Sequence, residues 1–466
     1  MMLSTAEVER GLARLKVKKA TGPDGITSRL LKSCSRQLCR IVEHIFNLSL
    51  RLHKVPQLWK TSCVVPVPKS SRPSDFNHYR PVALTSHLAK TLERLVLHHL
   101  RPLVSSSADP LQFAYQPSIG VEDAVIFLMQ RSLSHLEQAG STVRIMFYDF
   151  SSAFNTIQPE LLRDKLDHAG VCHQLTSWLL DFLTNRPQFV RTGGCVSDTV
   201  VCSTGAPQGT VLAPLLFTVY TADFTHHSAN CHLQKFSDDS AIVGLIDNGD
   251  EREYRELNQR FVDWCRRNRL QINAGKTKEL VVDFRRRKVP PSPVNIQGTD
   301  IEIVDSYKYL GVHLNKNLDW TVNTQAVYKK GQSRLHLLRR LRSFGVRDGL
   351  LRTFYDSVVA SAIFYGVVCW SSSITAAERK RLDKLVKKAG SVLGCSLDPV
   401  EVVGARRMVA KLSSIMDNVS HPLHETVRAL ESSISDRLRH PRCVTERHRK
   451  SFFPAAIRLY NQACSQ

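Results

Sequence analysis

The most constraining feature of this sequence is a pair of adjacent aspartates, Asp238 and Asp239, between two short apolar runs. The runs, Leu233–Phe236 and Ala241–Ile246, predict two strands that are joined by an acidic turn. A third strand is predicted over Val143–Asp149, because this segment is rich in β-branched and aromatic residues and ends at a carboxylate. Adjacent carboxylates are costly to keep charged unless a cation neutralises them. The pair therefore predicts either a metal site or a well-solvated turn.

The two interpretations differ in what Asp149 does. A strand alternates its side chains between two faces, so one acid of the pair can point toward a partner on a neighbouring strand. With Asp149 as that partner, the acids would form an all-oxygen site suited to Mg²⁺. The simpler explanation is that all three are solvated turn or cap residues, which is the usual role of such acids. The acids alone leave both interpretations open.

The charge distribution favours a polyanionic partner. The 466 residues include 64 Lys and Arg against 42 Asp and Glu, a net charge of +22. Residues 151–250 carry −5, whereas residues 1–150, 251–400 and 401–466 carry +9, +13 and +5. Such an excess predicts binding to nucleic acid, although surface cations also serve solubility. The acid pair lies in the one acidic block.

Composition excludes several other classes of protein. Hydrophobic residues make up 42% and charged residues 23% of the chain, which is typical of globular proteins and not of disordered ones. Twelve cysteines without CxxC pairs predict reduced thiols in an intracellular compartment. We expect no membrane span, since the best candidate, Ser357–Trp370, is shorter than the roughly 20 residues required. The charged N-terminus is not typical of a signal peptide.

Apolar spacing predicts a mixed helix and strand chain. Helices are expected where apolar residues recur every three or four positions, and strands where short β-branched runs end at turn residues. Lys69–Pro81 is expected to be a loop and Ile301–Leu314 a hairpin. The other predicted helices are within Thr5–Leu52 and at Leu84–Leu103, Pro159–Ala169, Leu175–Thr184, Val211–Tyr220, Glu251–Asn268, Tyr328–Arg342, Gly349–Tyr365 and Ala376–Leu393; the other strands are Ser62–Pro68, a hairpin over Phe189–Ser203, and Leu280–Phe284.

Six sequence words, in a fixed order, carry a family resemblance. Together they closely resemble the reverse transcriptase of a non-LTR (LINE-type) retrotransposon, and flanking words extend the likeness to nearly the whole chain. The words are NHYRPVAL (Asn77–Leu84), YDFSSAFNTI (Tyr148–Ile157), GAPQGTVLAPLLFTVY (Gly205–Tyr220), FSDDSAIVG (Phe236–Gly244), NAGKTKEL (Asn273–Leu280) and YKYLGVHL (Tyr307–Leu314).

The resemblance implies an α/β right-hand polymerase fold with fingers, palm and thumb, followed by a helical basic C-terminal region. It places an N-terminal helical extension at residues 1–58, fingers and palm at residues 59–314, and thumb and C-terminal helices at residues 315–466. Full-length elements of this class carry an endonuclease domain upstream. Nothing in this sequence resembles that domain, so we expect either that the open reading frame is truncated or that the nicking activity is supplied elsewhere.

The implied activity is RNA-directed DNA polymerisation, in which a DNA 3′ end is extended with dNTPs on an RNA template. The reaction would use two Mg²⁺ ions, with Mn²⁺ as a possible substitute. In the family pattern Asp149 and Asp238 are direct metal ligands, the backbone carbonyl of Phe150 adds an oxygen, and Asp239 is a supporting acid. The implied partners are an RNA template, a DNA primer or RNA–DNA hybrid, and dNTPs, with no membrane; the sequence does not indicate an oligomeric state.

The resemblance also implies substrate contacts, each with a simpler alternative. Phe154 matches the bulky residue that excludes a ribose 2′-hydroxyl, unless it is only a core aromatic. Gln208 and Gly209 match residues that line the nascent base pair, where glycine permits close backbone approach.

Three cations complete the implied substrate site. Lys69 and Arg80 would contact the triphosphate, unless they are exposed loop cations. Lys276 would protonate the leaving pyrophosphate, and a solvated loop lysine is an equal alternative.

One residue of the acidic turn departs from the family pattern. Ser237 stands where the family usually has Ala, and serine is small enough to fit.

Two features of the rest of the chain concern zinc binding and localisation. His440, Cys443, His448 and Cys464 cluster near the end without zinc-finger spacing, so we expect no zinc site there. The tract Arg285–Lys288 is a weak nuclear-import candidate, and integration of such elements implies nuclear as well as cytoplasmic localisation.

The predicted helix Tyr328–Arg342 begins a basic region, Tyr328–Arg352, in which eight cations accompany one acid, Asp348. It would suit a thumb helix lying along the backbone of a hybrid duplex, whereas a solvated helix face is the alternative. The rival to the enzyme is a catalytically silent, polymerase-derived nucleic-acid-binding protein. The intact Asp149, Asp238, Asp239 and Gln208 favour the enzyme.

Overall fold

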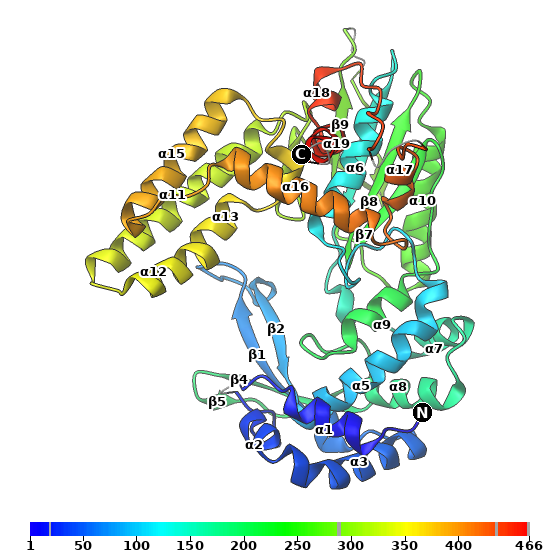
Figure 1. Ribbon diagram of the computed structural model, residues 1–466. Coiled ribbons are helices and arrows are strands. Elements are labelled where there is room, and N and C mark those ends of the chain that lie inside the picture. The colour runs from blue at the N-terminus through cyan, green and yellow to red at the C-terminus, as the bar shows by residue number, and fades with distance from the viewer. Residues whose placement is uncertain (18–19, 287–289, 434–436, 464–466) are drawn as a thin grey trace. The chain divides into compact units, whose positions relative to one another are not determined.

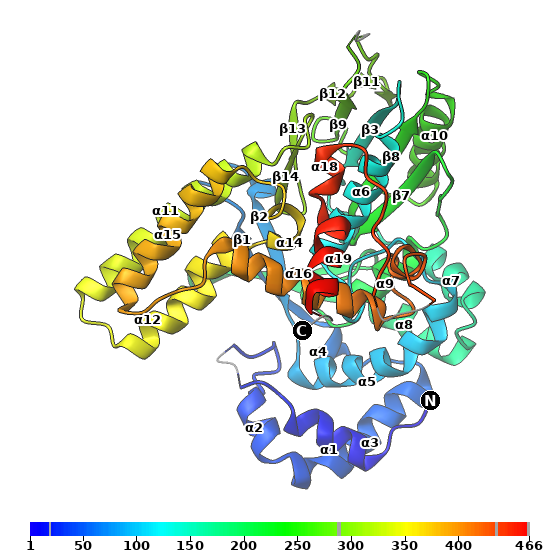
Figure 2. The same ribbon diagram turned by 45° about the horizontal axis from the view of Figure 1, so that its top comes forward.

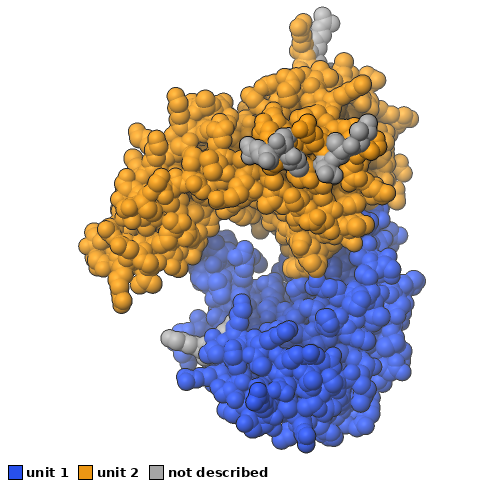
Figure 3. All heavy atoms as spheres, in the orientation of Figure 1, with its two compact units in different colours: residues 1–112, 150–225, 261–272 blue, residues 113–149, 226–260, 273–466 orange. Residues whose placement is uncertain are grey.

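The chain forms two compact units, each assembled from three separate stretches of sequence (Figure 3). The computed structural model describes residues 1–17, 20–286, 290–433 and 437–463. Unit 1 comprises residues 1–112, 150–225 and 261–272, and unit 2 comprises residues 113–149, 226–260 and 273–466.

Unit 1 contains a five-stranded sheet (Figure 1). Strand β1 pairs antiparallel with β2 and parallel with β4, and β4 also pairs with β5 and β6. The strands are β1 (Ser62–Pro68), β2 (Tyr79–Leu84), β4 (Arg186–Thr192), β5 (Cys195–Val196) and β6 (Val200–Cys202). The hairpin predicted over Phe189–Ser203 is confirmed in its β4–β5 turn.

One prediction in this sheet was wrong. The loop expected over Lys69–Pro81 ends early, because β2 begins at Tyr79. Pro81 fits in β2 because β2 is an edge strand, where proline is tolerated.

Helices form the rest of unit 1. Two of them begin at residues whose side chains satisfy free backbone N–H groups: Ser4 and Glu7 form a reciprocal capping box at α1, and Ser86 accepts two N–H bonds at α5. Helix α1 packs on α3 and α5. The helices are α1 (Thr5–Ala13), α2 (Ser28–Ser33), α3 (Ser35–Leu52), α4 (Gln57–Lys60), α5 (His87–Val104), α7 (Pro159–His168), α8 (His173–Leu183) and α9 (Ala213–Tyr220), with 3₁₀ turns at Phe76–His78, Ser105–Ser107 and Ala153–Asn155.

Unit 2 is built on a second five-stranded sheet, in which β3 is the central strand (Figures 1 and 2). Strand β3 pairs antiparallel with β8 on one side and with β9 on the other. The order is β12 (Glu302–Ile303), β9 (Lys278–Asp283), β3 (Thr142–Tyr148), β8 (Asp239–Ile246) and β7 (Cys231–Phe236). The predicted strands at the acidic residues are therefore confirmed.

The two faces of this sheet are covered differently. Gln234 donates a hydrogen bond of 3.0 Å to the carbonyl of Ala124 in α6 (Val121–His135), so α6 lies on the face of Gln234. Tyr148 lies on the other face and donates a bond of 2.7 Å to Asn258 in α10 (Arg252–Arg267), whose last residues, from Phe261, belong to unit 1. Alternating side chains thus bury the strands from both sides.

A buried ionic network supports the α10 face of the sheet. Arg144 on β3 donates two bonds of 2.8 Å to Glu279 on β9 and pairs with Glu251 at 2.6 Å. Tyr254 of α10 also donates to Glu279, at 2.6 Å. Arg144 and Glu279 are both almost completely buried, so each depends on the other for compensation of its charge.

Two small hairpins follow the sheet. The pairs are β10 (Asn295–Ile296) with β11 (Thr299–Asp300), and β13 (Ser306–Tyr309) with β14 (Val312–Asn315). The single hairpin predicted over Ile301–Leu314 was too simple. Its first residues form β12, which pairs parallel with β9, and the hairpin begins at Ser306.

The C-terminal part of unit 2 is helical. It contains α11 (Thr321–Ser343), α12 (Asp348–Phe354), a π-helical turn (Tyr355–Ala360), α13 (Ser361–Ile363), α14 (Val367–Trp370), α15 (Ala376–Leu393), α16 (Val400–Met416), α17 (His424–Arg428), α18 (Glu446–Arg449) and α19 (Phe452–Ala463). The stretch Asp348–Trp370 is long and apolar enough to cross a membrane, but 56% of its most apolar window is buried in the protein. A core helix passes the same test of length and composition.

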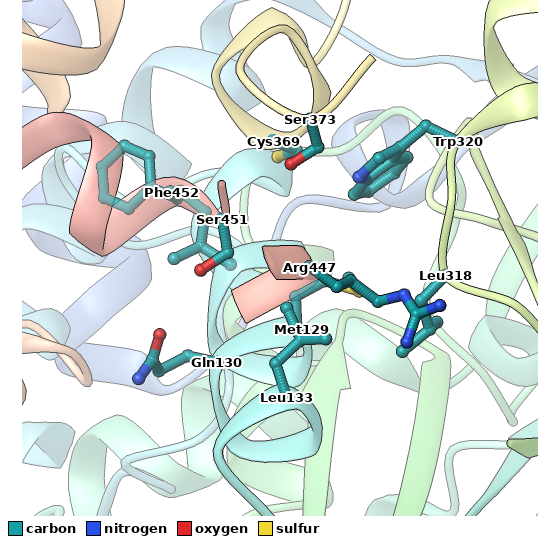
Figure 4. A pocket seen from close by; sticks show the side chains of 11 residues that line it. Met129, Gln130, Leu133, Leu318, Trp320, Cys369, Ser373, Arg447, Ser451 and Phe452 are labelled. Carbon is teal, nitrogen blue, oxygen red and sulfur yellow. The ribbon is translucent and has the colours of Figure 1, made fainter. Parts of the chain in front are cut away.

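The last helices pack against α6, and polar contacts lie beside this packing. Glu137 accepts the N–H groups of Val444 and Thr445 at 2.7 and 3.0 Å, and Lys411 pairs with the buried Asp123 at 2.9 Å. Figure 4 shows the small cavity left at this junction, about 10 Å³, where Arg447 and Met129 are among the lining residues. So small a cavity has room for about one water molecule and none for a substrate.

Candidate functional site

In unit 2 the strand register brings the predicted acids to one end of the sheet. Phe236 of β7 pairs with Asp239 of β8, so Ser237 and Asp238 form a two-residue turn. Tyr148 of β3 pairs with Ser240 of β8, and Asp149 follows directly. Continuing the antiparallel register by one residue sets Asp149 opposite Asp239. The sequence prediction that Asp149 is the partner of the acid pair on a neighbouring strand agrees with this register.

The electrostatics of this end reflect the gathered carboxylates. The pKa of Asp239 is raised to about 6, first by loss of hydration and then by the negative charges of Asp238 and Asp149. Tyr307 has a pKa raised to about 12 by burial and by the charges of Asp239 and Asp149. Its ring stacks on Phe147 at 4.2 Å. Tyr307 thus faces the acids, a position its sequence word did not indicate.

The backbone of Asp149 is fixed by the turn that contains Lys276. Asn273 donates its N–H to the carbonyl of Asp149 at 2.8 Å, and the hydroxyl of Thr277 accepts the Asp149 N–H at 3.3 Å. Thr277 also donates to the carbonyl of Asn273 at 2.9 Å. The side chain of Lys276 is exposed beside this clamp, so both of its interpretations stay predictions.

The acidic turn is supported by a residue that the sequence did not single out. Ser237 has a φ of +61°, a left-handed conformation that few residues other than glycine adopt. Its hydroxyl hydrogen-bonds the hydroxyl of Tyr115 at 2.8 Å. The pKa of Tyr115 is raised by burial and by the charges of Asp238 and Asp239. Tyr115 lies in Gln112–Val125, QFAYQPSIGVEDAV, which is one of the flanking words that extend the family resemblance, and that likeness is the signal that could have drawn attention to it.

The donor chemistry of the acids suits a hard divalent cation, because three carboxylates supply oxygen ligands and negative charge. Within the described residues, however, no group of three or more His, Cys, Asp or Glu is arranged to hold a metal ion. That finding covers the three acids of unit 2 and the described members of the C-terminal cluster, His440, Cys443 and His448. In that cluster His448 pairs with Glu137 at 3.1 Å, and Cys464 lies outside the described residues.

In unit 1 the predicted residues gather around the Gln208–Gly209 loop. Ala83 of β2 donates its N–H to the carbonyl of Gln208 at 2.8 Å. Gly209 has a φ of +110°, and a Cβ there would come within 2.9 Å of the carbonyl oxygen of Ala83. Glycine is therefore required at residue 209 both by the conformation and by the close approach of the two backbones.

The same loop is bound to the segment of Phe154. Ala206 donates to the carbonyl of Phe154 at 2.8 Å, and Gly205 donates to that of Ile157 at 2.7 Å. The half-buried ring of Phe154 stacks on Phe217 of α9 at 4.7 Å. Phe154 and Gln208 therefore belong to one cluster, as expected if they contact the same substrate.

The remaining predicted residues of unit 1 are placed less tightly. Arg80 of β2 pairs with Val67 of β1, and its side chain is exposed. Lys69 is also exposed and donates from Nζ to the carbonyl of Asn77 at 2.9 Å. Phe150 forms an isolated bridge with Ile272. The roles of these residues stay predictions.

Glu93 on α5 is a buried acid that sequence analysis missed. Its Oε2 accepts the N–H groups of Val211 and Leu212 at 2.5 and 3.1 Å. The side chain is 1% exposed, and burial raises the pKa to about 7 although the two backbone bonds lower it. Only its charge within the apolar pattern of α5 could have drawn attention to it.

The basic helix has the expected two-sided character. Leu335 and Leu338 of α11 are buried, whereas Lys329, Lys330 and Arg339 are exposed. Asp348 pairs with Arg342. Most cations of α11 are therefore left on the solvent side.

Comparison with protein-family models decides the family. The model described as reverse transcriptase (RNA-dependent DNA polymerase) matches residues 67–314, which is more than half of the chain. The chain belongs to the reverse transcriptase family. A second, short match covers residues 320–361 and is described as the N-terminal part of alkylated DNA repair protein alkB homolog 8. The reverse transcriptase match includes the acids of unit 2 and the Gln208–Gly209 loop of unit 1.

Curated relatives of this reverse transcriptase chain come from mobile elements. The RNA-directed DNA polymerase from mobile element jockey of Drosophila melanogaster is 26% identical over 78% of this chain and 40% of its own length. The jockey protein of Drosophila funebris is 26% identical over 93% of the chain and 48% of its own length. The Pol polyprotein from type-1 retrotransposable element R1 of Bradysia coprophila is 24% identical over 87% of the chain. The chain spans about half the length of these relatives, and the predicted likeness to non-LTR elements is confirmed.

Proposed function

We propose that the chain is an RNA-directed DNA polymerase that extends a DNA 3′ end on an RNA template, as in LINE-type retrotransposition. The observation that carries the proposal is the meeting of Asp149 and Asp239 in one row at the end of the unit 2 sheet, with Asp238 in the adjoining turn. These acids occur in the sequence order of the family's motifs. In polymerase terms, the unit 2 sheet would be the palm, residues from 59 onward in unit 1 would include the fingers, and the helices from residue 315 would include the thumb.

Asp149 and Asp238 would bind the metal ions directly, together with the carbonyl oxygen of Phe150, and Asp239 would support them. Two Mg²⁺ ions, or Mn²⁺ in their place, would activate the primer 3′-hydroxyl and neutralise the leaving pyrophosphate. The raised pKa of Asp239 supports the assignment, because part of the shift, after the effect of burial, comes from the negative charges of Asp238 and Asp149 nearby. Lys276, beside the backbone clamp of Asp149, would donate the proton to pyrophosphate.

The unit 1 cluster would select and orient the incoming nucleotide. Gln208 and Gly209 would line the nascent base pair, and Phe154 would exclude a 2′-hydroxyl. Arg80 and Lys69 would contact the triphosphate, with the planar fork of arginine suited to phosphate oxygens. The hydrogen bonds that join the Phe154 segment to the Gln208–Gly209 loop support a shared role in binding the nucleotide.

The proposed partners are an RNA template and a DNA primer, held as a hybrid by backbone contacts. The exposed cations of α11 support such contacts, which depend on charge and duplex shape and not on sequence. We also propose nuclear and cytoplasmic localisation. The candidate import tract Arg285–Lys288 lies partly outside the described residues, since Arg287 and Lys288 are not described.

Primer extension tests the proposal. Purified protein should incorporate dTTP on poly(rA) primed with oligo(dT) in the presence of Mg²⁺, and Asp238→Asn should abolish incorporation. Asp300→Asn is the matched control, because Asp300 is an exposed acid on the small β11 strand. Full activity in Asp238→Asn would contradict the metal assignment. Salt-sensitive RNA binding without any incorporation by the wild type would instead support the silent nucleic-acid-binding protein.

A further inference from the structure

Helix α9 begins without a cap of its own. The first N–H groups of a helix have no partner within the helix and need acceptors from elsewhere. The N-cap residue of α9, Leu212, has no side chain that can accept a hydrogen bond. Glu93, on a different helix, accepts through Oε2 the N–H groups of Val211, the residue before the cap, and of Leu212, the N-cap residue itself.

The arrangement leaves Glu93 committed to this segment. Its other carboxylate oxygen, Oε1, is buried and has no hydrogen-bond partner among the described residues. A buried carboxylate without an ion-pair partner is costly unless hydrogen bonds compensate it. The two bonds to the α9 segment are therefore the contacts that offset this cost.

Glu93 holds the end of the Gln208–Gly209 loop that lies next to α9. The start of the loop is held by Phe154 and Ile157, and its middle by Ala83. Between Gln208 and α9, Thr210 bonds only locally, to the carbonyl of Pro207. Loss of Glu93 would release the α9 end of the loop and move Gln208 and Gly209 relative to β2.

We propose that Glu93 is a positioning residue for the incoming deoxynucleotide. By holding the N–H groups of Val211 and Leu212, it sets the Gln208–Gly209 loop in the conformation that binds the nascent base pair. The inference rests on the polymerase function proposed above. It adds a residue that touches no substrate and acts on nucleotide affinity through the backbone.

The test is steady-state extension of oligo(dT) on poly(rA), with the KM for dTTP, kcat per active site and the Kd for primer–template measured separately. Glu93→Ala should raise the KM about tenfold, because two buried N–H groups lose their acceptor. The kcat per active site and the Kd should stay within about twofold of the wild type, since the loop is not part of the metal site. Glu93→Gln should restore the KM to within about threefold, because its amide oxygen can accept the same bonds.

Thr91→Val is the matched control. Thr91 is equally buried on α5 but bonds only within the helix, to the carbonyl of His87 at 2.9 Å, so its KM should equal that of the wild type. An unchanged KM in Glu93→Ala, or a Glu93→Gln as impaired as Glu93→Ala, would overturn the proposal. A fall only in the active fraction would also overturn it, because that is the signature of a structural role.

Two further outcomes stay informative. If Glu93→Ala does not fold, Glu93→Asp serves, since its shorter side chain withdraws the acceptor while keeping the charge; a KM equal to that of the wild type would then contradict the inference. An inactive wild type would refute the proposed function itself. An active wild type with an unaltered KM in the Glu93 variants would refute only the inference.

Discussion

The two units hold their site residues by different means. In unit 2 the acids take their positions from strand register, because Asp149 and Asp239 follow from the pairing of β3 with β8. In unit 1 the Gln208–Gly209 loop lies outside the strands, and it is held by a few backbone hydrogen bonds and by the buried side chain of Glu93. Register is a property of the whole sheet, whereas a loop depends on a few bonds. Substitutions of the acids should therefore change chemistry with the fold intact, and substitutions of the loop anchors should change substrate affinity.

The largest effect should come from the acids themselves. Asp149→Asn should lower kcat about 10³-fold, because several kcal/mol of charge stabilisation is lost. Asp239→Asn should lower it only about tenfold if Asp239 is a supporting acid. Single-turnover primer extension measures both, and unchanged circular dichroism confirms that the sheet is intact. Equal losses in the two variants would contradict the division between ligand and supporting acid.

Next in size is the stability of the sheet that carries the acids. Arg144→Leu leaves Glu279 buried without compensation and should cost about 3–5 kcal/mol in the free energy of unfolding. Urea denaturation measures this loss. The double variant Arg144→Leu, Glu279→Leu should recover part of it, because two apolar side chains replace the pair. The folded fraction should keep the wild-type KM for dNTP. A raised KM would mean that a substitution in the unit 2 sheet also changes the nucleotide affinity that we assign to unit 1.

The pH dependence of stability tests the loop anchor. The pKa of Glu93 is raised from 4.5 to about 7 in the folded chain. Its contribution to the free energy of unfolding is therefore complete below pH 4.5 and is lost as the pH rises through 7. The size of this pKa shift limits the pH-dependent loss in the free energy of unfolding to about 3 kcal/mol. The charged groups acting on Glu93 are Lys90 and Arg94 on α5. The segment Val211–Tyr220, which packs on α5, has no charged residue in its sequence. Helix α1 also packs on α5, and its charged residues are Glu7, Glu9 and Arg10.

Glu93→Gln is the reference for this measurement, because glutamine does not titrate and the other groups are common to both proteins. The free energy of unfolding of the wild type relative to Glu93→Gln should fall between pH 5 and pH 8, as measured by urea denaturation at each pH. A difference that is constant with pH would show that Glu93 is charged at the same pH in the folded and unfolded chains.

A smaller effect is expected at Phe154. Phe154→Val should reduce the preference for dNTP over rNTP by about 10- to 100-fold, or 1–3 kcal/mol, if the ring excludes the 2′-hydroxyl. Competition between dTTP and UTP on poly(rA) measures the preference. Phe217→Leu is the matched control, because it removes the stacking partner and keeps Phe154. A reduced preference in the control alone would assign Phe154 to the core.

The smallest effect should be seen at the acidic turn. Tyr115→Phe removes the hydrogen bond to Ser237 and should lower kcat about two- to fivefold, consistent with about 1 kcal/mol for one bond. Ser237→Ala should have the same effect, and the double variant should be no worse than either single variant. Additive losses would mean that the two hydroxyls act independently on the acids.

Much of the candidate site followed from local sequence. The strands that end at Asp149 and flank Asp238 were predicted because β-branched runs and turn residues determine them locally. The family resemblance then placed Phe154 and Gln208 in one substrate site, and the structure joins their segments. The edge strand at Tyr79 was missed because its pairing with β1 is a tertiary property that the local sequence does not show.

Residues defined by distant contacts were not predictable. Glu93 is separated by more than 100 residues from the N–H groups it accepts, and Tyr115 is similarly distant from Ser237. Neither contact leaves a periodic or local signal. The roles assigned to Lys69, Arg80 and Lys276, and the boundaries at residues 58 and 314, stay predictions.

The interleaving of the two units constrains how this protein can change over time. The chain passes between units after residues 112, 149, 225, 260 and 272. Any contiguous block that spans several of these points carries parts of both units. Recombination between related elements that exchanged such a block would combine parts of two parents. The acid-bearing sheet, or the Gln208–Gly209 loop with the residues that hold it, would then come partly from each parent. Asp149 and Phe150 illustrate this constraint, because neighbouring codons specify residues of different units, and the two units must be inherited together.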